Sequence, residues 1–144
     1  MKAIDHFSSE ERKNIRDAIT RAEQLTSGEI RVYIEDECHG DVLDRAAFIF
    51  SELKMHQTEL RNGVLIYLAL HHRKFAILGD AGIHAKVGTD FWNSIKDTML
   101  HHFKVQKFTK GLIDGIDLAG DALKEYFPHR ADDKNELSDD IVFG

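Results

Sequence analysis

The feature that most constrains the fold is an unbroken apolar run from Val64 to Leu70. The polar turn His71–Arg73 separates it from a second apolar run, Phe75 to Leu78. The first run does not alternate with polar residues, so both faces of this strand should be covered, as in the central strand of a layered α/β domain. Because the second run follows after too few residues for a crossover, the two runs are predicted to form an antiparallel hairpin.

One further strand and four helices are predicted around this hairpin. Residues 29–35 alternate between apolar and polar, which indicates a half-exposed strand nearer the sheet edge. The segment between this strand and the hairpin is long enough for a helix, so the strand is predicted to run parallel to the first strand of the hairpin, joined to it by a right-handed crossover. The helix starts are expected at Ser8 with Glu11 in a capping box, at Asp41, at Thr89 and near Thr109. The order is therefore αβαββαα, a small mixed sheet with helices on its faces.

This topology predicts which loops meet. Gly28–Glu29 should lie at the same end of the sheet as Asn62–Gly63 and Gly79–Asp80, because parallel strands start together and a hairpin reverses direction. The loop 36–41 and the turn His71–His72 should lie at the opposite end.

The first of these two ends is predicted to hold a cation site. Three segments bring polar groups there, each beside a glycine that lets backbone approach a small ligand. Carboxylate, amide and carbonyl oxygens suit Ca²⁺, or Mg²⁺ as the alternative. The predicted metal ligands are Glu29, Asp80 and Asp90, supported by Asn62, Gly79 and Gly82. Ordinary turn chemistry of Asn-Gly and Gly-Asp is the competing explanation.

Other polar groups are weaker candidates. The acids Asp36, Glu37, Asp41 and Asp44 could attract a cation, although a solvated loop and helix capping explain them as well. The chain has nine histidines, but the adjacent pairs 71–72 and 101–102 share no helical face. Surface histidines are therefore favoured over a zinc site.

Composition limits the class of protein. The 144 residues make one domain, predicted over 1–128, followed by an acidic and flexible tail, 129–144, pinned by residues 141–143. The net charge is −6 and no basic stripe occurs, which argues against nucleic-acid binding. No signal peptide or membrane span is recognisable, so a cytoplasmic, monomeric protein is expected.

Several segments resemble the TPM domain family. The matching segments are Thr26–Val32, Asn62–Leu70, Arg73–Lys74, Gly79–Ile83, Phe103–Phe108 and Gly111–Ile116. The resemblance covers about residues 8–127 and includes the tail of a small soluble bacterial branch. It implies a Rossmann-like αβα sandwich without a dinucleotide site, with calcium binding in some members and acid phosphatase activity in plant members. Gln106-Lys107 stands where the family carries glycine and aspartate.

Three functions follow from these observations. The first is a divalent-cation-binding module, with Ca²⁺ as the expected ion. The second is an interaction scaffold in envelope or stress maintenance that uses the exposed strand and the tail to bind a protein partner, still unidentified. The third is a metal-assisted acid phosphatase, which is ranked last because no nucleophile–base pair is recognisable in the sequence.

Overall fold

The computed structural model of the chain describes residues 2–130 and 137–144. Within these residues one sheet forms, with strands in the order β3-β2-β1-β4. Strand β1 (Glu29–Glu35) pairs parallel to β2 (Gly63–Ala69), and β2 pairs antiparallel to β3 (Lys74–Gly79). The predicted crossover and hairpin are therefore confirmed. The short strand β4 (Val142–Phe143) pairs parallel to the other edge of β1.

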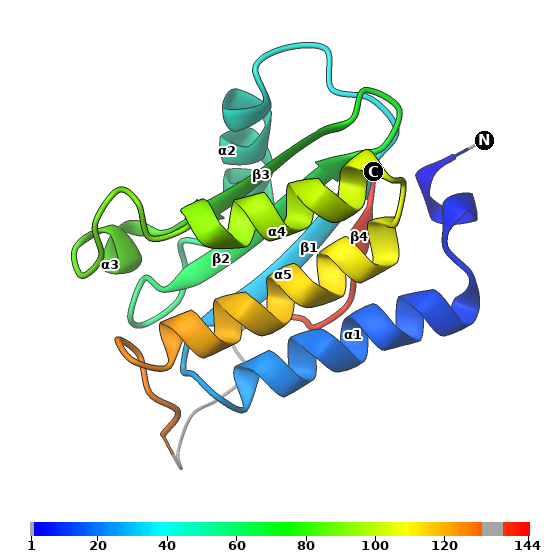
Figure 1. Cartoon of the computed structure of the whole chain (residues 1–144). Helices are drawn as coiled ribbons and strands as arrows, with labels where there is room; N and C mark the ends of the chain where they lie inside the picture. The colour runs from blue at the N-terminus through cyan, green and yellow to red at the C-terminus, as the bar shows by residue number, and fades with distance from the viewer. Residues whose placement is uncertain (1, 131–136) are drawn as a thin grey trace.

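The helices cover both faces of this sheet. They are η1 (Ala3–His6), α1 (Ser9–Glu23), α2 (Val42–Glu52), α3 (Ala81–His84), α4 (Asn93–Lys104) and α5 (Phe108–Leu123). Figure 1 shows α1, α5 and α4 side by side over one face, with α2 on the other. Ser8 and Glu11 form the predicted capping box at the start of α1. The αβα sandwich is confirmed.

Strand β2 explains why two apolar cores can share one sheet. All of its residues are buried, and they alternate between the two faces. Val64, Ile66 and Leu68 belong to the core beneath α1, α4 and α5. Leu65 and Tyr67 belong to the smaller core beneath α2. An unbroken apolar run is what a strand covered on both faces requires.

Strand β1 shows the predicted alternation, with its three apolar residues buried and Arg31 and Tyr33 only partly buried, but it does not lie near the sheet edge. It lies between β2 and β4, and its terminal residues Glu29 and Glu35 are both buried. The predicted edge position was wrong because β4 comes from the tail, which carries too few apolar residues to signal a strand. Residues 131–136 lie outside the described part of the chain, so the flexibility expected of the tail stays a prediction.

Two smaller differences concern the region after β3. The predicted helical turn is present as α3, but Thr89 does not cap the next helix, which begins at Asn93 after Trp92. Among residues 2–130 and 137–144, none of the helices combines the length and apolar character that crossing a bilayer requires.

Candidate functional site

The sheet register brings the segments predicted to form a site to one end of the sheet. Glu29 is paired with Gly63 across β1 and β2. The Glu29 amide donates a hydrogen bond to the Asn62 carbonyl at 3.3 Å, and the Asp80 amide donates one to the Gly63 carbonyl at 2.9 Å. The deduction that these loops meet is confirmed.

The carboxylate of Asp80 is already bound by protein groups. Its Oδ2 accepts a hydrogen bond from Arg61 Nε at 2.8 Å, and its Oδ1 accepts one from Arg61 Nη2 at 3.0 Å. Oδ1 also accepts from the Ala81 amide at 2.7 Å and so caps α3. Asp80 is 6% exposed. Its charge is therefore neutralised by Arg61, and both oxygens face donors of the protein.

Asn62 and the glycines at this end have packing roles. Asn62 Nδ2 donates to Ser27 Oγ at 3.4 Å. A Cβ atom at Gly82 would lie 2.1 Å from the Leu60 carbonyl oxygen. At Gly79 it would lie 3.2 Å from an indole ring carbon. Close approach of neighbouring chain segments, rather than of a ligand, accounts for glycine at both positions.

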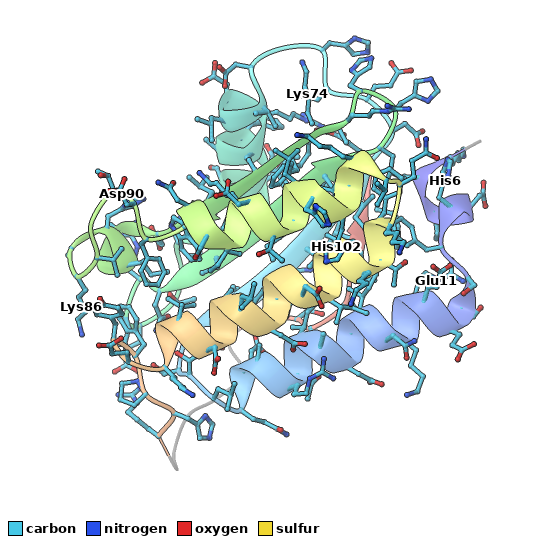
Figure 2. The ribbon with its side chains drawn as sticks, in the orientation of Figure 1. His6, Glu11, Lys74, Lys86, Asp90 and His102 are labelled. Atoms are coloured by element: carbon cyan, nitrogen blue, oxygen red, sulfur yellow. The ribbon has the colours of Figure 1, made fainter. Side chains whose placement is uncertain are left out.

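Glu29 and Asp90 are not gathered around Asp80. The buried Glu29 Oε2 accepts a hydrogen bond from the Leu137 amide at 2.6 Å. Asp90 is exposed in the loop beyond α3 (Figure 2), and its Oδ1 accepts from Asn93 Nδ2 at 3.3 Å. Within the described residues, these three carboxylates do not bring their oxygens within 4.8 Å of one another. Cation binding by this set stays a prediction.

The opposite end of the sheet carries an open cavity of about 780 Å³. It lies where the carboxyl ends of the parallel strands β1 and β4 meet the start of α2, and Gly144 forms part of its wall. Ligands of open α/β sheets bind at this kind of edge. The acids that line the cavity are Glu35, Asp36, Glu37, Asp41 and Asp44, and Arg45 lines it as well. Asp41 is the predicted helix cap, since its Oδ1 accepts hydrogen bonds from the Leu43 and Asp44 amides.

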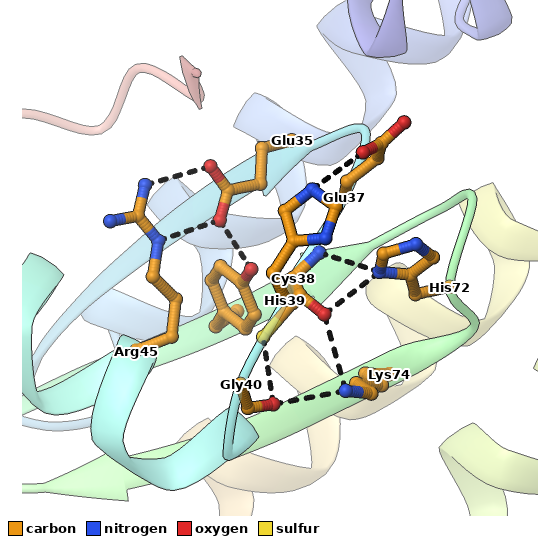
Figure 3. A network of polar contacts seen from close by, with 9 residues as sticks. Glu35, Glu37, Cys38, His39, Gly40, Arg45, His72 and Lys74 are labelled. Carbon is orange, nitrogen blue, oxygen red and sulfur yellow. Dashed lines mark hydrogen bonds and ion pairs between the residues drawn. The ribbon is translucent and has the colours of Figure 1, made fainter.

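Glu35 and Arg45, labelled in Figure 3, line this cavity and form a polar network with Tyr67. Arg45 Nε and Nη2 each donate to the Glu35 carboxylate at 2.9 Å, and the Tyr67 hydroxyl donates to Glu35 Oε2. Burial by itself would raise the pKa of Glu35, but the hydrogen bonds from Arg45 and Tyr67 outweigh it and lower that pKa. Burial, followed by the Glu35 hydrogen bond, raises the pKa of Tyr67. Tyr67 is therefore a protonated donor and not a nucleophile.

A second polar group lies on the loop and hairpin turn at the same end (Figure 3). His39 Nε2 lies 2.7 Å from Glu37 Oε2. His72 Nδ1 lies 2.8 Å from the Cys38 carbonyl oxygen, and Lys74 Nζ donates to the same oxygen at 3.1 Å. Glu37, His39 and His72 each offer a ligand atom within 4.8 Å of the other two, and among the residues described this is the one such group.

Sequence reasoning missed this group because it compared histidines that are adjacent in the chain. His39 and His72 are distant in sequence and meet only because β1 and β2 are parallel and β2 turns back into β3. The His71 amide donates to the Asp36 carbonyl at 2.7 Å and joins the two loops. The predicted topology already placed these loops at one end, and that was the available signal.

Comparison with known proteins agrees with this architecture. The profile of the TPM domain matches residues 3–122. A comparison of the chain with curated proteins found no match. The chain is similar to the BA42 protein of the psychrophilic bacterium Bizionia argentinensis, solved by NMR. The two are 48% identical with a TM-score of 0.91, over 96% of this chain and 95% of that one.

Two more distant NMR structures share the fold. The N-terminal domain of a P. gingivalis protein has a TM-score of 0.70 at 18% identity, over 86% of this chain and 82% of that one. The N-terminal domain of the cg2496 protein of Corynebacterium glutamicum has a TM-score of 0.66 at 14% identity, over 81% of this chain and 74% of that one. With the profile match over most of its length, the chain belongs to the TPM domain family.

Proposed function

We propose that this TPM domain is a divalent-cation-binding module that takes Ca²⁺, with Mg²⁺ as the alternative, in the cavity between β1 and α2. The observation that carries the proposal is the lining of that cavity by Asp36, Glu37, Asp41 and Asp44. Hard cations select carboxylate and carbonyl oxygens. Acids outnumber the one arginine, Arg45, in the lining, and an excess of one sign of charge in an open recess raises the local concentration of counter-ions.

The cavity is preferred over the end formed by Glu29, Asp80 and Asp90 because two of its acids, Asp36 and Asp44, are accessible, although Asp41 caps α2. Asp80 would have to release Arg61 before it could bind a cation. Asp44 is exposed at the cavity, where a hydrated ion can reach it without rearranging the backbone. Two exposed or half-exposed acids, Asp36 and Asp44, are thus the residues on which the proposal depends most.

Calorimetry and NMR titration of the full chain with Ca²⁺ test the proposal. We expect saturable binding, with amide shifts centred on residues 36–44. The double variant Asp36→Asn/Asp44→Asn should weaken binding by about tenfold or more, since each lost carboxylate removes charge from the ligand set. Asp90→Asn is the matched control and should bind like the wild type. Shifts centred on residues 79–82, or loss of binding in Asp90→Asn, would move the site to the other end of the sheet.

The phosphatase and the interaction scaffold stay predictions drawn from the family resemblance and the tail, because the strand expected to be exposed, β1, is paired on both edges. A phosphatase at this cavity would use the bound cation to polarise a phosphoryl oxygen. Turnover of a generic phosphomonoester should then require Ca²⁺ or Mg²⁺ and disappear in the Asp36→Asn/Asp44→Asn variant. Turnover that survives in that variant would separate the phosphatase from this site.

A further inference from the structure

We propose that Glu37, His39 and His72 form a second metal site, specific for a borderline transition-metal ion of the Zn²⁺ class. The proposal goes beyond Ca²⁺ binding and does not rest on it, because two of its three ligands are imidazoles, although Glu37 also lines the cavity proposed for Ca²⁺. Two imidazole nitrogens and one carboxylate oxygen are typical ligands of Zn²⁺ and its neighbours, whereas Ca²⁺ and Mg²⁺ select oxygen. Three protein ligands would leave a fourth position for water or a small anion.

The geometry needs only small side-chain movements to hold an ion. Two ligands bound tetrahedrally to Zn²⁺ lie about 3.4 Å apart. The Glu37–His39 contact of 2.7 Å must therefore open slightly, and the third ligand, within 4.8 Å, must move inward. The side chains of His39 and Glu37 are 77% and 46% exposed, so neither is held by packing. The contact between the His39 and Glu37 side chains is then replaced by two bonds to the metal.

His72 Nδ1 lies within reach of a backbone carbonyl, the kind of acceptor that a metal-binding histidine usually uses. Its Nδ1 lies 2.8 Å from the Cys38 carbonyl oxygen, and the Cys38 amide donates a hydrogen bond to the same nitrogen at 3.0 Å, so the two contacts belong to opposite tautomers of the ring. In the tautomer that donates Nδ1–H to the carbonyl, Nε2 carries the lone pair that a metal requires. Metal-ligating histidines commonly donate their second ring nitrogen to a backbone carbonyl, which fixes both tautomer and ring orientation.

The two segments that carry the ligands are tied together. Lys74 Nζ donates to the Cys38 carbonyl at 3.1 Å and to the Gly40 carbonyl at 2.9 Å, which fastens the loop after β1 to the start of β3 (Figure 3). The His39 and His72 rings meet edge to face, with centroids 5.0 Å apart. The backbone frame is thus set before a metal arrives, and only the exposed side chains of Glu37 and His39 and the half-buried His72 must adjust.

The test is titration of the full chain, free of any polyhistidine tag, with Zn²⁺ in saturating Ca²⁺. We expect one Zn²⁺ per chain by calorimetry, and a Co²⁺-loaded form with the visible absorption of a tetrahedral site. His39→Ala and His72→Asn should each weaken Zn²⁺ binding by about a hundredfold. Asparagine retains a polar partner for Cys38 and so protects the fold. His101→Ala, an exposed histidine on α4, is the matched control.

The two metal proposals fail separately. If Asp36→Asn/Asp44→Asn loses Ca²⁺ binding but keeps Zn²⁺ binding, the two ions use different ligands. The same conclusion follows if His39→Ala loses Zn²⁺ binding but keeps Ca²⁺ binding. Absence of Zn²⁺ binding by the wild type would overturn the inference. Unchanged affinity in His39→Ala and His72→Asn, or loss of affinity in His101→Ala, would overturn it as well, because the ion would then be held elsewhere.

Discussion

Arg61 and Asp80 form a two-point ion pair that closes one end of the sheet. Arg61 Nε and Nη2 lie 2.8 and 3.0 Å from the two Asp80 carboxylate oxygens. The Asp80 carboxylate is buried, and Arg61 adopts a left-handed backbone with φ of 50°. The pair joins the loop before β2 to the turn after β3. Asp80, which the sequence suggested as a metal ligand, therefore stabilises the fold through its ion pair with Arg61.

Replacing Asp80 with alanine should destabilise the fold. The variant loses the cap of α3 and leaves the Ala81 amide without its acceptor, which costs about 1–2 kcal/mol in the free energy of unfolding. Urea denaturation of the full chain measures it, and Asp90→Ala should change the same quantity by less than about 0.5 kcal/mol. A rise in Tm with Ca²⁺ that is present in the wild type but absent in Asp80→Ala would favour Asp80 as a cation ligand.

Gly82 should not tolerate a side chain. An alanine Cβ would lie 2.1 Å from the Leu60 carbonyl oxygen and 2.6 Å from that of Arg61, and backbone atoms cannot move aside cheaply. We expect Gly82→Ala to lower the free energy of unfolding by about 3 kcal/mol. Gly88→Ala is the control, since nothing lies within 4 Å of its Cβ position. Thermal and urea unfolding of the two variants should differ clearly, and equal stability would contradict the close packing.

The parts of the fold that could be predicted are those where the sequence pattern is compatible with only one structure. The apolar run in β2 needs cover on both faces, and the short turn before β3 permits only a hairpin. Strand β4 was not predictable in this way. Two residues, Val142 and Phe143, pair with β1, and their stability comes from packing such as the contact of Phe143 with Phe7, with ring centroids 6.1 Å apart.

The candidate site was predictable in its topology but not in its chemistry. Register places Glu29 and Asp80 at one end, yet the partner that neutralises Asp80 is Arg61, which had no motif to signal it. At the other end the loops also meet as predicted, but the side-chain directions of His39 and His72 decide whether they form a group. Side-chain pairing across loops depends on three-dimensional distances that a spacing rule does not contain.

Removing the Tyr67 hydroxyl should make stability depend differently on pH. Glu35 has a lowered pKa in the folded state, so it contributes stability above its ordinary value of 4.5 that is lost as the pH falls. Tyr67→Phe removes one of the hydrogen bonds that lower this pKa. We expect a loss of about 1 kcal/mol at neutral pH. The difference in free energy of unfolding between Tyr67→Phe and the wild type should become smaller as the pH falls and the Glu35 carboxylate becomes protonated.

Urea denaturation over a series of acidic to neutral buffers measures this gap. Tyr126→Phe is the matched control, because Tyr126 packs against Phe91 in the turn after α5 and lies outside the Glu35 network. It should show the wild-type pH dependence. A Tyr67→Phe gap that stays constant across the series would mean that the hydroxyl contributes by packing alone.

Glu23 should make the fold weaken as the pH rises. This last residue of α1 accepts a hydrogen bond from the Ile30 amide at 2.9 Å. Burial, and then the hydrogen bond to Asp139, raise its pKa to about 10. The folded chain therefore keeps the Glu23 proton at neutral pH, whereas the unfolded chain, with the ordinary value of 4.5, releases it. Because the folded state binds more protons, stability falls as the pH rises between these two values.

Glu23→Gln should flatten this dependence, since glutamine retains an acceptor for the Ile30 amide and carries no proton to lose. We expect the free energy of unfolding of the wild type to fall by more than about 1 kcal/mol between mildly acidic and alkaline buffer. The free energy of unfolding of Glu23→Gln should change less, so that the difference between the two proteins shifts in favour of the variant as the pH rises. Glu10→Gln, an exposed change in the first turn of α1, should follow the wild type. Equal pH slopes in Glu23→Gln and the wild type would show that Glu23 is ionised in the folded chain.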